Sequence, residues 1–230
     1  MSAATAPSTQ QLPANTNQDV EAKYHAPAYP PVPIYAPPII ANPGPLGLSS
    51  FALTTFVLSL HNAGAGVPAN GPNEVVVGLA LFYGGVVQIL AGMWEFRTGN
   101  TFGATAFSSY GGFWLSFACI LIPSFNITAS YTDTAVLEKS LGIYLMSWAL
   151  FTGLLLIASH RSSIGLMSLF FFLFITFILL AAAKFNDSLT TQVAGGAFGV
   201  ITALIAWYNA LSGLLTKDSS YFLLPTGRLN

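Results

Sequence analysis

Residues 164–183 read IGLMSLFFFLFITFILLAAA, twenty residues in a row without Asp, Glu, Lys or Arg. An α-helix of about 20 residues is about 30 Å long, which is the thickness of the hydrocarbon core of a bilayer. Only 7% of the 230 residues are charged and 53% are hydrophobic, whereas about 25% of the residues in a soluble domain are charged. The stretch therefore predicts a membrane-spanning helix.

Five other segments of similar length are nearly free of charge, so the predicted fold is an all-α, polytopic membrane protein with six transmembrane helices. The charged residues between Asn42 and Leu215 fall in the gaps or at segment ends, because a charge at the centre of a spanning helix costs about 2.5–3.5 kcal/mol. The predicted spans are Pro45–Ala63, Val75–Met93, Phe102–Ile122, Leu141–Ser159, Ile164–Ala183 and Gln192–Leu214.

The basic residues predict the orientation of these spans. Six spans place both termini on one side of the membrane, together with the second-to-third and fourth-to-fifth loops. That side carries Lys23, Arg97, Arg161, Lys217 and Arg228, and the other side carries Lys139 and Lys184. Because cytoplasmic loops are enriched in Lys and Arg, both termini are predicted to be cytoplasmic.

The chain divides into three parts by composition. Residues 1–41 are rich in Pro, Ala, Gln, Asn and Thr, a composition that cannot build a core, so we expect a disordered cytoplasmic tail. Residues 42–215 form the predicted membrane domain, and residues 216–230 form a short cytoplasmic tail. The first 25 residues lack a basic region followed by an apolar core, so no cleavable signal peptide is expected.

Charge and motifs exclude several classes of function. The net charge of −1 argues against a nucleic-acid partner, because phosphate binding needs a surplus of Lys and Arg. The sequence has no His/Cys/carboxylate cluster, nucleophile elbow or phosphate-binding glycine loop. We therefore expect no enzyme activity, no metal and no cofactor.

The stretch NPGPLGL, residues 42–48, starts the first span with residues that helices normally avoid. Asn42 is a favoured N-cap, Pro43 then occupies the first helical position, and Pro45 stays inside the turn whose amides receive no helical bond. Gly44 and Gly47 add no bulk, and a helix start carries a partial positive charge that suits an anion. The physics leaves two interpretations open: a helix entrance beside an anion path, or a rigid helix start alone.

This stretch closely resembles the signature of the acetate uptake transporter family, and four further stretches resemble its fungal ammonia/acetate transporter branch. They are SSFALTTFVLSLHNAG (49–64), YGGVVQILAGMWEF (83–96), NTFGATAFSSYGGFW (100–114) and AWYNALSG (206–213). The resemblance extends from residue 42 to about residue 215. It implies six-helix protomers in a hexamer, each with its own pore, which carry acetate or related short monocarboxylates across the fungal plasma membrane.

The resemblance also implies a narrowest point in the pore, formed by a Phe, a Tyr and a Leu. The matching positions in this chain are Phe51, nine residues after Asn42, Tyr110 in SSYGGFW, and Leu173 in the fifth span. An apolar ring with one phenol hydroxyl rejects hydrated ions and offers one hydrogen bond to a passing carboxyl group.

Polar residues inside the spans complete the predicted pathway, because hydrocarbon offers them no hydrogen-bond partner. Thr55 can bond a carbonyl of its own helix, but Gln88 near the middle of the second span cannot do so easily. We interpret Gln88 as a donor to a substrate carboxylate and His61 as an anchor at the membrane surface. The predicted substrate-pathway residues are Asn42, Pro43, Gly44, Pro45, Leu46, Gly47, Leu48, Thr55, Asn62 and Gln88.

Three functions stay open at this level: transport of short monocarboxylates, export of ammonium or ammonia, and a structural scaffold. A scaffold would use the glycines that recur every seven residues at 78, 85 and 92, which we expect on one helical face, although the same face can serve packing within one protomer. No Asp or Glu is expected in mid-membrane, and Glu95 is expected to pair with Arg97. The carboxylate would then cross as undissociated acid or by a channel-like path.

Overall fold

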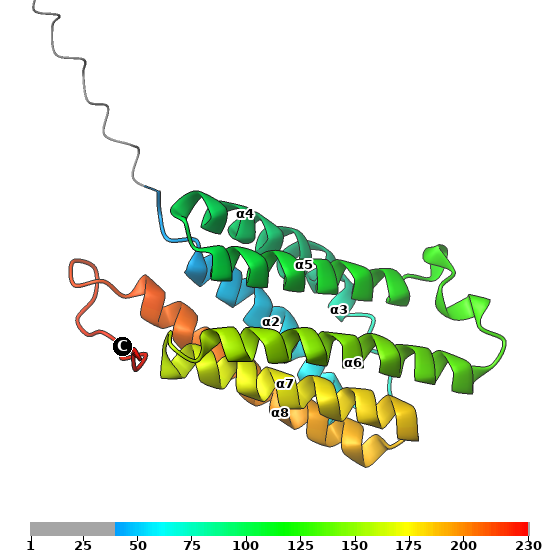
Figure 1. Ribbon diagram of the computed structural model, residues 1–230. Helices are drawn as coiled ribbons and strands as arrows, with labels where there is room; N and C mark the ends of the chain where they lie inside the picture. The colour runs from blue at the N-terminus through cyan, green and yellow to red at the C-terminus, as the bar shows by residue number, and fades with distance from the viewer. Residues whose placement is uncertain (1–39, 230) are drawn as a thin grey trace, which may run out of the picture. The chain divides into compact units, whose positions relative to one another are not determined.

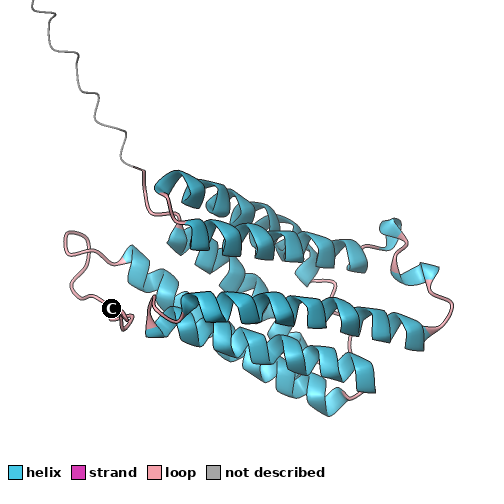
Figure 2. Ribbon diagram, viewed as in Figure 1, coloured by secondary structure: helices cyan, strands magenta, loops and turns pink. Residues whose placement is uncertain are grey.

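The computed structural model describes residues 40–229, and these residues form a bundle of helices without a strand (Figures 1 and 2). Most of the predicted tail, residues 1–39, lies outside the described residues. The elements are α2 (Gly44–Ala63), α3 (Val76–Leu81), the π-helix η2 (Phe82–Val87), α4 (Gln88–Thr98), α5 (Thr101–Leu121), the 3₁₀ turns η3 (Pro123–Phe125) and η4 (Thr128–Ser130), α6 (Thr134–Ser159), α7 (Ile164–Asn186) and α8 (Leu189–Leu214).

Five helices in this part of the chain are long and apolar enough to cross a membrane. They are Val76–Thr98, Thr101–Leu121, Thr134–Ser159, Ile164–Asn186 and Leu189–Leu214. The remaining predicted span, α2, has 20 residues but is less apolar, because it carries five Ser and Thr residues as well as His61 and Asn62. It packs against α8, α4, η2, α3 and α5. Neighbouring helices, rather than lipid, therefore surround much of α2.

Two helices begin three or more residues earlier than predicted, because a side chain caps each of them. The Asp133 carboxylate accepts a hydrogen bond from the Ala135 amide at 2.8 Å, so α6 starts seven residues before the predicted Leu141. The Ser188 hydroxyl accepts from the Thr191 amide at 3.3 Å, so α8 starts before the predicted Gln192. Such caps satisfy amides at the helix start, which lets the helix extend beyond the apolar run.

The π-helix η2 corrects the prediction that three glycines share one face. Gly85 and Gly92 are buried against α5, where a Cβ on Gly85 would lie 2.6 Å from the Leu115 side chain and one on Gly92 would lie 2.8 Å from the Ser108 amide nitrogen. Gly78 has nothing within 4 Å of its Cβ position. Gly85 lies inside η2, whose wider turn shifts the helical register after Gly78, so a seven-residue spacing no longer keeps all three glycines together.

The segment after α8 folds back onto the turn between α6 and α7, where the red end of the ribbon meets the start of α7 in Figure 1. The amides of Ile164 and Gly165 donate to the carbonyls of Gly227 and Thr226 at 2.8 and 3.0 Å, and the Leu229 amide donates to Ser162 O at 3.2 Å. We call residues 224–229 the C-terminal strap. It supplies partners for the first amides of α7, which no intrahelical carbonyl can reach.

Candidate functional site

Two cavities lie inside the described bundle. The large cavity has a volume of about 510 Å³ and is lined by the C-terminal half of α2, the loop after it, and parts of α5, α6, α7 and α8. The small cavity has a volume of about 180 Å³ and is lined by the N-terminal half of α2, by α4, and by parts of α5 and α7. At about 30 Å³ per water molecule, even the small cavity has room for a small organic acid.

Each residue of the predicted constriction lines at least one of the two cavities. Phe51 lines both cavities, Tyr110 lines the small cavity and Leu173 lines the large one. Their exposed fractions are only 3–4%, and the rings of Phe51 and Tyr110 have centroids 5.6 Å apart. Phe51 therefore packs against Tyr110, and Leu173 belongs to the same buried hydrophobic cluster.

The hydroxyl group of Tyr110 is engaged within the protein. It pairs with the Thr152 hydroxyl at 2.9 Å, and Thr152 itself donates to Trp148 O at 2.7 Å. Because Thr152 uses its hydrogen on that carbonyl, Tyr110 donates its own hydrogen to Thr152. The hydrogen of the phenol is therefore engaged, and Tyr110 does not present the free donor that we predicted.

Gln88 is the most unusual polar residue of the small cavity. Its side chain is fully buried, it lines the cavity, and neither Oε1 nor Nε2 has a partner among the described residues. Leaving buried polar atoms unpaired costs about 1–3 kcal/mol each. Gln88 directly follows η2, and π-turns often occur at functional sites. Gln88, for which the sequence predicted a hydrogen-bond donor, therefore has an unpaired donor and an unpaired acceptor.

The large cavity also contains buried polar atoms without a partner in residues 40–229. They are Thr55 Oγ1, His61 Nδ1 and Trp114 Nε1. Thr55 and Asn62 line this cavity as predicted. His61, which we interpreted as an anchor at the membrane surface, is partly exposed and also lines this cavity. The indole of Trp114 was not predicted, because nothing in the sequence indicates which helical face an aromatic residue occupies.

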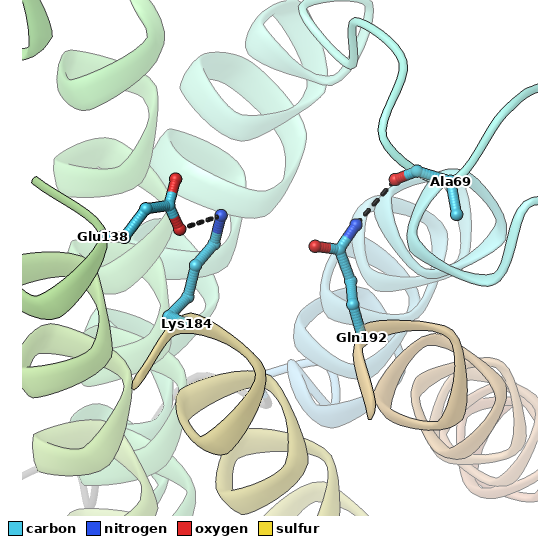
Figure 3. Close-up of polar contacts among 4 residues, drawn as sticks. All are labelled: Ala69, Glu138, Lys184 and Gln192. Carbon is cyan, nitrogen blue, oxygen red and sulfur yellow. Dashed lines mark hydrogen bonds and ion pairs between the residues drawn. The ribbon is translucent and has the colours of Figure 1, made fainter. Parts of the chain in front are cut away.

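Two polar contacts lie at the end of the large cavity where α6, α7 and α8 meet the loop after α2 (Figure 3). Lys184 Nζ lies 2.8 Å from Glu138 Oε2, and both side chains are about one-third exposed. The Gln192 side chain donates to Ala69 O at 2.6 Å and so fixes the loop to α8. Since partly exposed ion pairs contribute little stability, the chief effect of Glu138 is to neutralise the charge of Lys184 in the lining of this cavity.

The start of α2 differs from the prediction by one residue. Pro43 is the N-cap and Gly44 the first helical residue, while the Asn42 side chain accepts a hydrogen bond from the Gly44 amide at 3.0 Å. Asn42 therefore still caps the helix, but from one position further out. Pro45 occupies the second helical position, where an amide N–H would have no intrahelical partner, so the proline breaks no helical hydrogen bond.

The motif residues divide between the cavity and the packing around it. Asn42, Gly44 and Leu48 line the small cavity. A Cβ on Gly47 would lie 2.6 Å from the ring of Phe107, so that glycine is needed for close packing. The remaining motif residues, which line neither cavity, are Pro43, Pro45 and Leu46.

Glu95 was not predicted as a site residue, yet its carboxylate lines the small cavity and is only 3% exposed. Its Oε2 accepts from Asn100 Nδ2 at 2.8 Å and lies 3.3 Å from the Thr98 hydroxyl, which makes its shorter bond, at 2.9 Å, to the backbone carbonyl of Glu95. The predicted pairing with Arg97 is wrong: Arg97 is exposed and makes no ion pair in residues 40–229. Side chains two positions apart on a helix point in different directions.

Comparisons with known proteins agree with this architecture. Residues 26–230 match the GPR1/FUN34/yaaH family. The chain is 51% identical over 200 residues to "Ammonia transport outward protein 2" of Saccharomyces cerevisiae, covering 86% of this chain and 69% of that protein. It is 49% identical over 196 residues to "Acetate permease A" of Emericella nidulans, covering 80% and 65%. The solved structure of the bacterial acetate channel SatP has a TM-score of 0.73 at 36% identity, covering 82% of this chain and all of that one.

Proposed function

The chain belongs to the GPR1/FUN34/yaaH family, and from this premise we propose that it carries acetate and related short-chain monocarboxylates across a membrane. The observation that carries the proposal is the pair of cavities on either side of Phe51, with the unpaired amide of Gln88 in the smaller one. A small carboxylate has the size for this cavity, and its two oxygens can accept from the amide. The relatives named as an acetate permease and an acetate channel support the same substrate class.

In the proposed arrangement α2 is the sixth transmembrane helix, next to the five candidate spans of this multi-pass membrane protein. Both termini face the cytoplasm, as the distribution of Lys and Arg favours. The membrane domain comprises residues 42–215, followed by a short cytoplasmic segment, and six copies assemble in the plasma membrane with one pore each. The six-helix protomer, the hexamer and the plasma membrane are what the family resemblance of the sequence implies.

The proposed pathway runs through both cavities. From the small-cavity side the substrate passes the motif at residues 42–48, contacts Gln88 and crosses the ring of Phe51, Tyr110 and Leu173. Thr55 and Asn62 then line the way through the large cavity. The helix start at Gly44 adds a favourable field for an anion.

Ammonium is the second candidate substrate, and the aromatic cluster around Tyr110, beside the small cavity, gives it a specific argument. The ring of Tyr110 lies 5.6–6.0 Å from the rings of Phe51, Trp148 and Phe151, and aromatic faces attract cations. Glu95 adds an acceptor. A relative named as an ammonia transport outward protein supports this candidate, and uptake assays with each solute separate the two.

Replacing Gln88 by Leu should lower acetate flux roughly ten- to a hundred-fold, the effect of losing one hydrogen bond to a charged group. The same change removes two unpaired buried atoms, so unfolding should become harder by about 1–2 kcal/mol. Labelled acetate uptake into liposomes containing the purified protein, with empty liposomes subtracted, measures the first effect, and thermal unfolding in detergent measures the second.

Gln192→Leu is the matched control for stability. It removes the bond to Ala69 O and should therefore destabilise the protein by about 0.5–1.5 kcal/mol, opposite in sign to Gln88→Leu. If Gln88→Leu transports acetate as fast as the wild type, the amide has no role in the pathway. If the wild type passes no more acetate than empty liposomes, the proposed substrate class is wrong.

A further inference from the structure

The large cavity has more room than the proposed substrate needs. At about 30 Å³ per non-hydrogen atom, the share of one water molecule in the liquid, acetate takes about 120 Å³ and hexanoate about 240 Å³. The small cavity, with a volume of about 180 Å³, has room for the first and not for the second, whereas the large cavity, with about 510 Å³, has room for both. The two cavities therefore differ in the longest acid that each can hold.

Two polar side chains lie at the end of the large cavity next to Phe51. Thr55 follows Phe51 by one turn of α2, and Trp114 follows Tyr110 by one turn of α5. Both helices run from the small cavity to the large one, and the rings of Phe51 and Tyr110 have centroids 5.6 Å apart. Thr55 and Trp114 are therefore at a similar level, one turn beyond the constriction.

Each of these two side chains has a hydrogen-bond donor without an acceptor. Trp114 is 2% exposed and Thr55 6%, and neither Trp114 Nε1 nor Thr55 Oγ1 has a partner among residues 40–229. The indole nitrogen can only donate, and the hydroxyl can donate or accept. Burying such groups unpaired is costly. A ligand with an oxygen-rich headgroup at this end of the cavity would supply the missing acceptor.

Between these donors and the open end of the cavity the wall is mostly apolar. The open end carries the exposed residues Asn70 and Asp187 and the ion pair of Lys184 with Glu138 (Figure 3). We call the apolar side chains between the two ends the apolar belt; they are Leu58, Phe117, Leu121, Leu145, Phe177 and Leu180. An alkyl chain attached to a headgroup at the donors would lie in this belt.

We propose that the large cavity is a binding site for unbranched monocarboxylates of about six to eight carbons, which occupy it without passing Phe51 and so inhibit transport. The carboxylate accepts from Trp114 and Thr55, and the alkyl chain lies in the apolar belt. Acetate meets the same donors but has no chain to hold it in the belt, so it moves on past Phe51. The inhibition rests on the proposed function, whereas the binding does not depend on it.

Inhibition should strengthen with chain length. Each CH₂ group buried in the belt raises affinity about three- to four-fold, so the inhibition constant of hexanoate should be about ten-fold lower than that of butyrate. The assay is the initial rate of labelled acetate uptake into liposomes containing the full chain, with empty liposomes subtracted. The competing acid is present at the same concentration and pH inside and outside, so that it creates no gradient of its own.

Variants separate the headgroup from the chain, each compared with its own uninhibited rate. Trp114→Phe removes the indole N–H and should weaken inhibition by butyrate and by hexanoate equally, about ten- to a hundred-fold. Leu145→Trp fills part of the belt from α6 and should weaken hexanoate about ten-fold while changing butyrate little. Leu121→Trp repeats this test from α5 in case Leu145→Trp does not fold. Trp207→Phe changes an indole that packs on Phe56 and lines neither cavity, and it should behave as the wild type.

Thermal unfolding in detergent measures binding without transport. A ligand that binds the folded protein raises the midpoint of unfolding. Hexanoate should raise the midpoint of the wild type and of Trp207→Phe more than the same concentration of butyrate does. In Leu145→Trp this difference between the two acids should disappear, which separates binding in the belt from general effects on the detergent.

The outcomes are distinguishable. Equal inhibition constants for butyrate and hexanoate in the wild type overturn the inference and leave acetate transport standing, and so does a ten-fold difference that survives in both Leu145→Trp and Leu121→Trp. Inhibition that Trp114→Phe does not weaken contradicts the assigned position of the headgroup. Wild-type liposomes that pass no acetate, from a protein whose unfolding midpoint hexanoate raises, overturn the proposed function and leave the binding site standing.

Discussion

Phe51→Ala should join the two cavities and admit solutes that the wild type excludes. Gluconate, which is larger than acetate and crosses lipid poorly, should enter liposomes at least about ten times faster through this variant, equivalent to a barrier lowered by about 1.4 kcal/mol. The reason is geometric: Phe51 is 4% exposed and is the side chain that lines both cavities. Selectivity for small acids should fall at the same time, because an apolar ring excludes hydrated solutes.

The matched control is Phe56→Ala on the same helix. Phe56 packs against Trp207, with ring centroids 5.1 Å apart, and lines neither cavity. This variant should keep the wild-type exclusion of gluconate. Thermal unfolding of both variants guards against misfolding, since a buried Phe→Ala change costs about 3–5 kcal/mol. Equal gluconate exclusion by Phe51→Ala and wild type would mean that the pathway does not pass Phe51.

Gly196→Ala should destabilise the bundle more than a glycine-to-alanine change at any other glycine of α8. A Cβ at this position would lie 2.7 Å from the carbonyl carbon of Asn62 and 2.8 Å from Ser59 O. These are backbone and not side-chain atoms, so no rotamer change relieves the clash and α2 must move away from α8. Overpacking costs about 1–3 kcal/mol and occasionally more, and here we expect the upper end of that range.

Gly78→Ala is the control of opposite sign. Nothing lies within 4 Å of a Cβ there, and Ala is more favourable than Gly inside a helix by about 0.5–1 kcal/mol. Thermal unfolding in detergent should give a midpoint several degrees lower for Gly196→Ala, with about 2–4 °C expected per kcal/mol, and an equal or higher one for Gly78→Ala. A wild-type midpoint for Gly196→Ala would contradict the close contact between α2 and α8.

Sequence reasoning succeeded where one rule dominates. Charge-free runs located the helices, because no partner in hydrocarbon can compensate a charge. The rule was weaker for α2, whose Ser and Thr residues are surrounded by other helices rather than lipid. Where a helix extends beyond its apolar run, its first residue is set by a cap such as Asp133 or Ser188. In the sequence such a polar residue cannot be distinguished from the polar residues of the loop beside it.

The site was predictable to a different extent. Gln88 was found because an amide in the middle of a span needs an explanation, and the trio at the constriction came from resemblance. Glu95 was missed, because at the edge of a predicted span it looks like a surface residue. A left-handed turn at Gly99 brings the Asn100 side chain back over it, and this folding of the chain is not visible in local composition. The register shift in η2 likewise has no local signal.

The C-terminal strap has a consequence for how the molecule is made. The amides of Ile164 and Gly165 find their partners on residues that lie beyond the whole of α8. During synthesis the first turn of α7 therefore lacks these protein partners, and its amides depend on water until α8 and the strap have emerged from the ribosome. The turn between α6 and α7 is thus among the last parts of the fold to close. A chain stalled before residue 224 would expose that turn to the quality-control machinery of the cell, even with every helix already in place.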